Sequence, residues 1–145
     1  MIHASRIMDA HIFEREGKRM KVMVVDDERD IELLFRQHFR KEIRQQQIDF
    51  SFALSGEEAL QQLRAMCQPP AVVLILSDIN MPGMNGLQLL KAVKHDFPAI
   101  RVAMITAYSN QYYEDAMASG ADHYYTKPID FTQLKNELFM EAVHG

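Results

Sequence analysis

The chain has 145 residues, 48% hydrophobic and 25% charged, which is enough for one globular domain with its own core. Its net charge is −4 and its basic residues are scattered, which argues against a nucleic-acid-binding surface. One cysteine excludes an intrachain disulfide, and the longest apolar stretch, residues 71–76, is too short to cross a bilayer. Because the N-terminus lacks the apolar core of a secretory signal, we expect a cytoplasmic protein. From its charge pattern and its short apolar stretches, we expect it to bind neither nucleic acid nor membrane.

Residues 1–20 show no regular apolar spacing and end in a charged run, which predicts a loosely structured extension. The pattern is then regular almost to the C-terminus, and we expect one domain over residues 21–142. Residues 139–145 are too few for a further domain. The chain is therefore either a stand-alone domain or a fragment of a longer protein.

From residue 21 onward, short apolar runs alternate with stretches whose apolar residues recur every three or four positions. The first pattern predicts strands and the second predicts amphipathic helices. Residues 48–52 alternate with polar residues, as in a strand with one face less covered, whereas residues 71–76 are apolar throughout, as in a strand covered on both faces. The expected elements are a strand at 21–25, a helix at 31–39, a strand at 48–52, a helix at 55–66, a strand at 71–76, a helix around 87–93, a strand at 102–105, a helix at 110–119, a strand at 123–126 and a helix around 134–138.

Three local signals set helix ends. Ser55 and Glu58 have the spacing of a capping box, so a helix should begin there. Asp130 resembles another N-terminal cap, and Gly120 fits the position just after a helix.

Five strands that alternate with five helices predict an α/β fold. Crossovers of this length make neighbouring strands parallel and place helices on both faces of the sheet. In such a doubly wound sheet the ligand crevice lies beyond the C-terminal ends of the strands.

Four of the five expected strands end in polar residues that could bind a ligand or take part in a reaction. Asp26 and Asp27 follow the first strand, Asp78 the third, Thr106 the fourth and Lys127 the fifth. The C-terminal ends of parallel strands share one edge of the sheet, so these side chains should gather there.

Three carboxylates in one crevice repel one another, and a hard divalent cation with oxygen ligands relieves that repulsion. Mg²⁺ suits the site, and one Mg²⁺ together with Lys127 brings the formal charge of the three aspartates to zero. Lys127 and Thr106 are then free to hold the oxygens of a phosphoryl group. Because a carboxylate can act as nucleophile, the sequence predicts a Mg²⁺-dependent site at which Asp78 forms an aspartyl phosphate.

Each of these residues also has a simpler explanation. An Asp pair before a helix commonly caps it, and an Asp before a Pro-Gly loop commonly forms a turn. A single Thr or Lys at a strand end is ordinary. Their joint placement at four separate strand ends favours function.

The same positions carry motifs that resemble the receiver domains of two-component response regulators. The match holds in order and spacing from about residue 20 to residue 142, and the combination is specific although no single motif is. The motifs are Val24-Val25-Asp26-Asp27-Glu28, Ser77-Asp78-Ile79-Asn80-Met81-Pro82-Gly83-Met84-Asn85-Gly86, Ile105-Thr106-Ala107 and Thr126-Lys127-Pro128.

The resemblance implies a flavodoxin-like sheet of strand order 2-1-3-4-5 and a phosphorylation-dependent signalling switch. Asp78 would accept phosphate from a sensor histidine kinase or a phosphotransfer protein. Asp27 and Asp78 would bind Mg²⁺ directly, Asp26 mostly through water, and Asn80 through its backbone carbonyl.

The resemblance also implies how the site is read out. Lys127 would pair with the phosphoryl oxygens, and its peptide bond to Pro128 would be cis. Thr106 would be the switch hydroxyl, and Tyr124 the aromatic residue that turns inward, with Tyr125 on the opposite face.

In the family, two further positions influence how long the phosphate lasts. Here they are Asn80 and Tyr108. A bulky tyrosine there would hinder the attacking water, which predicts slow self-dephosphorylation.

The resemblance places the output surface at roughly residues 110–142, facing an output domain or a downstream protein. Tyr112, Tyr113 and Met117 are candidates for exposure there. Such a protein is no enzyme beyond its own phosphorylation and dephosphorylation.

Two rival classes fit less well. A Mg²⁺-dependent phosphatase with an aspartate nucleophile would normally carry that Asp after the first strand and a second Asp two residues later, where this chain has Asn80 after Asp78. A dinucleotide-binding module would need a glycine-rich turn in place of residues 26–28, whose acids would repel a pyrophosphate.

Overall fold

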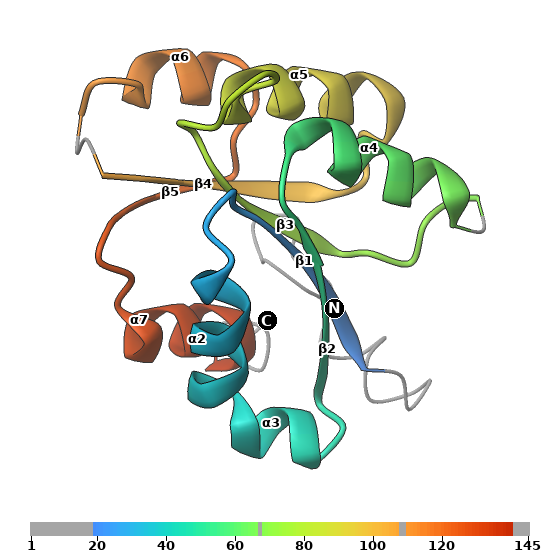
Figure 1. Ribbon diagram of the computed structural model, residues 1–145, viewed down its shortest axis with the longest axis vertical. Coiled ribbons are helices and arrows are strands. Elements are labelled where there is room, and N and C mark those ends of the chain that lie inside the picture. The colour runs from blue at the N-terminus through green and yellow to red at the C-terminus, as the bar shows by residue number, and fades with distance from the viewer. Residues whose placement is uncertain (1–18, 67, 108–109, 141–145) are drawn as a thin grey trace.

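The computed structural model describes residues 19–66, 68–107 and 110–140. Its centre is one sheet of five parallel strands in the order β2-β1-β3-β4-β5 (Figure 1), which confirms the expected topology. The strands are β1 Met20–Val25, β2 Ile48–Ala53, β3 Leu74–Asp78, β4 Arg101–Thr106 and β5 His123–Thr126.

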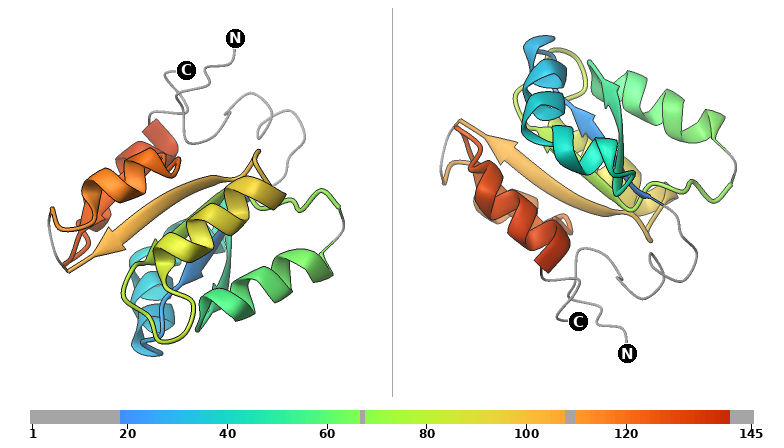
Figure 2. Two further views of the ribbon diagram at one scale, coloured as in Figure 1. Left: turned by 90° about the horizontal axis from the view of Figure 1, so that it is seen from above. Right: turned by 90° about the horizontal axis from the view of Figure 1, so that it is seen from below.

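Helices cover both faces of the sheet, as Figures 1 and 2 show: α4, α5 and α6 lie on one face, and α2, α3 and α7 lie on the other. This confirms the doubly wound, flavodoxin-like arrangement. The helical segments are α2 Asp30–His38, α3 Arg40–Arg44, α4 Gly56–Ala65, α5 Gly86–Asp96, α6 Tyr113–Ala118, α7 Phe131–Lys135 and the π-helical η1 Asn136–Met140.

The helices differ from the five expected ones in three places. Residues 40–44 form the extra helix α3, which the apolar pattern misses because Ile43 is its one apolar residue. The last helix changes from α to π geometry at Asn136. The helix expected at 110–119 is shorter, because the chain makes a turn in which the Tyr113 amide donates to the Asn110 carbonyl before α6 begins.

The helix signals in the sequence are confirmed with one change. Ser55 caps α4 by accepting the Glu58 amide hydrogen at 3.0 Å, but the Glu58 carboxylate accepts from Leu54 instead of closing the box on Ser55. Asp130 caps α7, and Gly120 follows α6 with a positive φ of 100°. These caps fix the orientation of the connections on both sides of the sheet.

The core consists of two clusters, one on each face of the sheet. In β1, Met23 and Val25 pack under α4 and α5, while Val22 and Val24 pack toward α2 and α7. Both faces of the central strands are therefore buried, which explains why residues 74–76 are apolar without alternation. The strand expected at 71–76 begins only at Leu74 and continues through Ser77 to Asp78.

Phe35 of α2 organises the second cluster. Its fully buried ring packs edge to face on Phe50 and Phe131, with ring centroids 5.6 Å and 5.1 Å apart. It also stacks with Phe39 at a centroid distance of 6.0 Å. One side chain thus joins α2 to β2 and α7.

The loop after β3 returns close behind the backbone of Asp78. The Gly86 amide donates to the Ile79 carbonyl at 2.8 Å, and Asn85 and Gln88 cap α5 reciprocally. A Cβ on Gly86 would overlap the Asp78 carbonyl oxygen and lie 2.8 Å from Cα of Ile79. Glycine is needed here because α5 begins directly against the end of β3.

Within the parts of the chain that the structure describes, none of the helices has the length and hydropathy needed to cross a membrane.

Replacement of Phe35 by Ala should lower the free energy of unfolding by about 3–5 kcal/mol, because a buried ring is lost from three elements. Urea unfolding followed by circular dichroism measures the change. Leu33 lies on the same helix with 61% of its surface exposed, and Leu33→Ala should stay within about 0.5 kcal/mol of the parent. Equal losses in the two variants would contradict this account of the core.

Replacement of Gly86 by Ala should lower the free energy of unfolding by about 1–3 kcal/mol, because the added methyl meets backbone that cannot move aside. Gly56 is the matched control, since it is also the first residue of a helix. The atoms nearest to a Cβ there belong to the side chain of Met84, which can shift aside, so Gly56→Ala should cost less than Gly86→Ala. Urea unfolding of the two variants tests the difference, and a neutral Gly86→Ala would refute it.

Candidate functional site

Backbone pairing brings the polar strand ends together. Asp78 lies beside Ile105 in the β3–β4 register, and the Lys127 amide donates to the Thr106 carbonyl at 2.7 Å. On the other side, the Asp26 amide donates to the Ala53 carbonyl at the end of β2. The ends of β1, β3, β4 and β5 thus form one edge, as the sequence predicts.

Three carboxylates meet at this edge. One oxygen from each of Asp26, Asp27 and Asp78 can be chosen so that all lie within 4.8 Å of one another. Asp26 and Asp78 are each only 7% exposed, whereas Asp27 is open to solvent. The site is therefore a partly buried acidic cluster with one exposed member.

Lys127 lies between the two buried carboxylates. Its Nζ is 3.2 Å from Asp26 Oδ2 and 3.4 Å from Asp78 Oδ2. It also approaches Glu28 Oε1 at 3.4 Å, a contact that the sequence did not predict. Glu28 is exposed and directly follows the Asp pair, so its acidic neighbours were the available signal.

The buried position raises the pKa of both aspartates. For Asp26, burial raises the pKa, and the Glu28 amide and Lys127 oppose this. For Asp78, burial and the negative charge of Asp26 raise the pKa against the pull of Lys127. Burial alone would lower the pKa of Lys127, but the two carboxylates outweigh it and the pKa rises. Burial therefore disfavours the charged carboxylates by more than Lys127 compensates.

The donor set fits a magnesium ion. Oxygens on opposite sides of Mg²⁺ lie about 4.2 Å apart, because each bond is about 2.1 Å long. One oxygen from each of Asp26, Asp27 and Asp78 lies within 4.8 Å of the others, so only small movements would bring all three within this largest ligand–ligand separation. A hard divalent cation would also stabilise the charged forms of the two carboxylates whose pKa values burial raises.

The two residues implied as switch elements lie on adjacent strands. Thr106 is fully buried at the end of β4. The half-buried ring of Tyr124 packs edge to face against Tyr113 at 5.2 Å, and burial raises the pKa of its hydroxyl. Tyr125 packs with the opposite core cluster, as its position predicts, and its hydroxyl donates to Glu137.

Other expectations from the family motifs have mixed outcomes. The peptide bond from Lys127 to Pro128 is cis, as expected. Tyr113 and Met117 are exposed on α6, but Tyr112 is only half exposed and packs against the first core cluster. Tyr108 lies outside the described residues.

Tyr112 also makes a contact that the sequence did not predict. Its hydroxyl donates to Asn80 Oδ1 at 3.3 Å, across 32 residues of chain. Asn80 is exposed two residues after Asp78. The contact joins the loop after β3 to the residue that precedes α6.

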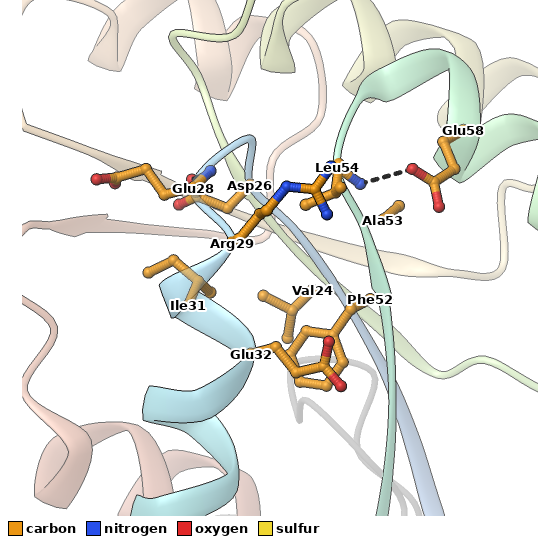
Figure 3. A pocket seen from close by; sticks show the side chains of 10 residues that line it. All are labelled: Val24, Asp26, Glu28, Arg29, Ile31, Glu32, Phe52, Ala53, Leu54 and Glu58. Atoms are coloured by element: carbon orange, nitrogen blue, oxygen red, sulfur yellow. Dashed lines mark hydrogen bonds between the residues drawn. The ribbon is translucent and has the colours of Figure 1, made fainter.

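A pocket of about 200 Å³ opens on the β2 side of Asp26 (Figure 3). Arg29 extends across it from the start of α2 toward Leu54, and Glu58 accepts the Leu54 amide hydrogen from the far side. Glu28, Glu32 and Glu58 outnumber Arg29 in this lining, so the pocket adds no surplus positive charge to the site.

Comparison with known proteins identifies relatives of the whole described domain. Residues 22–139 match the response regulator receiver domain family. Sporulation initiation phosphotransferase F of Bacillus subtilis is 32% identical over 81% of this chain and 90% of its own length. Two-component response regulator PhoP of Pseudomonas aeruginosa is 31% identical over 82% of this chain but only 50% of its own length. Transcriptional regulatory protein ZraR of Escherichia coli is 37% identical over 65% of this chain, which spans 21% of ZraR.

Solved structures agree. The response regulator protein TrrA from Thermotoga maritima, in complex with Mg²⁺ and BeF, superimposes with a TM-score of 0.67 and 28% identity, over 82% of this chain and 96% of its own. A receiver domain from Clostridium thermocellum superimposes with a TM-score of 0.73 at 22% identity, over 86% and 95% of the two chains, which supports the fold alone. With a matching fold, a clustered acidic site and a family match over residues 22–139, the chain belongs to the response regulator receiver domain family.

Proposed function

We propose that Asp78 is the phosphoryl acceptor of a two-component signalling switch and that Mg²⁺ is its cofactor. The observation that carries this proposal is the bridge from Lys127 to the buried carboxylates of Asp26 and Asp78. In this proposal, one crevice holds the acceptor carboxylate, the carboxylates that would bind the cation and a positive charge for the phosphoryl oxygens. The receiver domain family and the magnesium complex of TrrA support it.

The group transfer uses the chain's own residues. A carboxylate oxygen of Asp78 attacks phosphorus, and the bond from phosphorus to the donor nitrogen or oxygen breaks, which leaves an aspartyl phosphate. The leaving group takes up a proton from solvent. Lys127 then pairs with a phosphoryl oxygen, since its ammonium already lies 3.4 Å from Asp78 Oδ2.

Asp27 and Asp78 would hold Mg²⁺ directly, Asp26 mostly through water, and Asn80 through its backbone carbonyl. Asp27 is exposed and would be open to an ion arriving from solvent, while Asp26 is already engaged by Lys127 and the Glu28 amide. When bound, the ion offsets the charge that develops on the transferring oxygens.

The switch would act through Thr106 and Tyr124. Thr106 is the last residue of β4, beside the acceptor strand β3, and Tyr124 of β5 pairs with Met104 and packs its ring against Tyr113 of α6. A phosphoryl group that draws the Thr106 hydroxyl would leave space for Tyr124, so the charge biases a two-state element. The output surface would comprise roughly residues 110–142, where Tyr113 and Met117 are exposed.

A sensor histidine kinase or a phosphotransfer protein would supply the phosphoryl group, and an output domain or a downstream protein would read the switch. The chain spans a fifth of ZraR and half of PhoP, so the whole protein's output belongs to this proposal. We assign the switch to residues 21–142 and treat residues 1–20 as an extension. Turnover would be limited to the chain's own phosphorylation and dephosphorylation.

Incubation with Mg²⁺ and acetyl phosphate should add the mass of one phosphoryl group, and Asp78→Asn should abolish the addition because the nucleophile is lost. Intact-mass spectrometry measures it, with EDTA as the metal-free control. Asp49→Asn, at an exposed aspartate of β2, should label like the parent. Multiple turnover of phosphate esters without an adduct would favour the aspartate phosphatase instead, and an unlabelled parent would refute the proposal.

Replacing Lys127 by a neutral residue should separate its effect on Mg²⁺ binding from its effect on phosphoryl transfer. In Lys127→Gln, Mg²⁺ should bind about threefold or more tightly, because the ammonium no longer competes for Asp26 and Asp78. Phosphorylation by acetyl phosphate should nevertheless slow, because no charge receives the phosphoryl oxygens. Titration calorimetry measures binding, since the chain has no tryptophan to report it.

Lys91→Gln is the matched control, because Lys91 is exposed on α5. It should change neither Mg²⁺ affinity nor labelling rate. Weaker Mg²⁺ binding in Lys127→Gln than in the parent would mean that the lysine supports the ion instead of competing with it.

A further inference from the structure

We propose that Tyr112 is a positioning residue which acts through Asn80 to lengthen the lifetime of the phosphate on Asp78. This inference rests on the proposed function. It starts from the hydrogen bond between the Tyr112 hydroxyl and Asn80 Oδ1.

The two residues bridge the loops that flank the acceptor. Asn80 lies in the loop after β3, two residues beyond Asp78, and Tyr112 lies in the connection after β4, just before α6. β3 and β4 are neighbours, with Asp78 paired to Ile105. A bond between their loops therefore restrains how far the two sides of the crevice can separate beyond Asp78.

Tyr112 is anchored at its other end. Its ring packs against the core cluster under α5 and α6, and its carbonyl accepts the Ala116 amide hydrogen at 2.9 Å. The hydroxyl is thus held by a ring with little freedom, and Asn80 is the partner with an exposed, adjustable side chain. The tyrosine positions the asparagine, not the reverse.

Tyr112 also adjoins the switch tyrosine. The next residue, Tyr113, packs edge to face on the Tyr124 ring, with 5.2 Å between the ring centroids. The loop after the acceptor therefore has a connection to the start of α6 that does not pass through Thr106. A rearrangement of Tyr124 would therefore shift Tyr113 and the adjoining Tyr112, and with it the hydrogen bond to Asn80.

The consequence concerns hydrolysis. In that step water attacks phosphorus, the bond from phosphorus to Asp78 oxygen breaks, and the carboxylate and inorganic phosphate are released. A restrained crevice limits the approach of water, so loss of the bridge should shorten the lifetime. At 3.3 Å the bond is longer than the usual 2.7–2.8 Å for hydroxyl donors, so the effect should be modest.

The test is a double-mutant cycle on phosphate lifetime. The parent, Tyr112→Phe, Asn80→Ala and the double variant are phosphorylated with acetyl phosphate and Mg²⁺, desalted, and followed by intact mass. Tyr112→Phe keeps the packed ring and should shorten the half-life about threefold, as expected for one weak hydrogen bond. In the Asn80→Ala background the same change should have no further effect.

Controls separate this role from a structural one. Ser51→Ala removes a hydroxyl from β2, away from both loops, and should leave the half-life unchanged. Mg²⁺ affinity of Tyr112→Phe should stay within about twofold of the parent, because the proposed metal contact of Asn80 is its backbone carbonyl. Tyr112→Leu, which removes ring and hydroxyl, should shorten the half-life at least as much.

Three outcomes would overturn the inference. An unchanged or longer half-life in Tyr112→Phe excludes it, and so does a full effect that persists without the Asn80 side chain. If the parent takes up no phosphoryl group, the proposed function fails and the inference fails with it. If the parent is labelled but Tyr112→Phe keeps the parent's half-life, the inference is refuted and the proposed function stands.

Discussion

Two aspartate carboxylates are buried side by side at the edge of the sheet, with one lysine ammonium between them, and the rest of the site depends on this. Asp26 and Asp78 are held by adjacent parallel strands, so neither can retreat from the other. Burial and mutual repulsion raise the pKa of Asp78, and Lys127 offsets this only in part. Lys127 therefore stabilises the two charged carboxylates only in part, and a divalent cation can add the further positive charge.

The same crevice combines rigid and adjustable parts. Asp78 is fixed by β3 and by α5, whose first residue, Gly86, lies directly behind its carbonyl. Asp27, Glu28 and Asn80, in contrast, lie exposed on loops. A group-transfer site benefits from this division, because the nucleophile must be held in place while metal, donor and phosphoryl oxygens enter and leave. The fold supplies the first requirement through strand pairing and the second through its loops.

The sequence predicted those features of the site that follow from the parallel arrangement of the strands. Once Asp26, Asp78, Thr106 and Lys127 were placed at strand ends, parallel pairing alone required them to meet, and the strand order followed from the family resemblance. It missed contacts between side chains on separate loops, such as the approach of Glu28 to Lys127 and the bond from Tyr112 to Asn80. These depend on rotamers and loop paths, for which no periodic pattern exists. The helix α3 was missed for a related reason, because a short polar helix carries no apolar stripe.

Charge balance explains why such a site can act as a switch. Before phosphorylation, Lys127 divides its interaction between Asp26, Asp78 and Glu28. A phosphoryl group on Asp78 would add about one and a half to two negative charges at the carboxylate that the lysine already contacts. Lys127 would then favour the phosphoryl oxygens over its other partners, and neighbouring donors such as the Thr106 hydroxyl would be drawn the same way. That bias would arise at the ends of β4 and β5, the strands that carry Thr106 and lead to Lys127, close to Tyr124 and its contact with α6. A local change in electrostatics would therefore act first on this edge of the sheet, where Tyr113 of α6 packs on Tyr124.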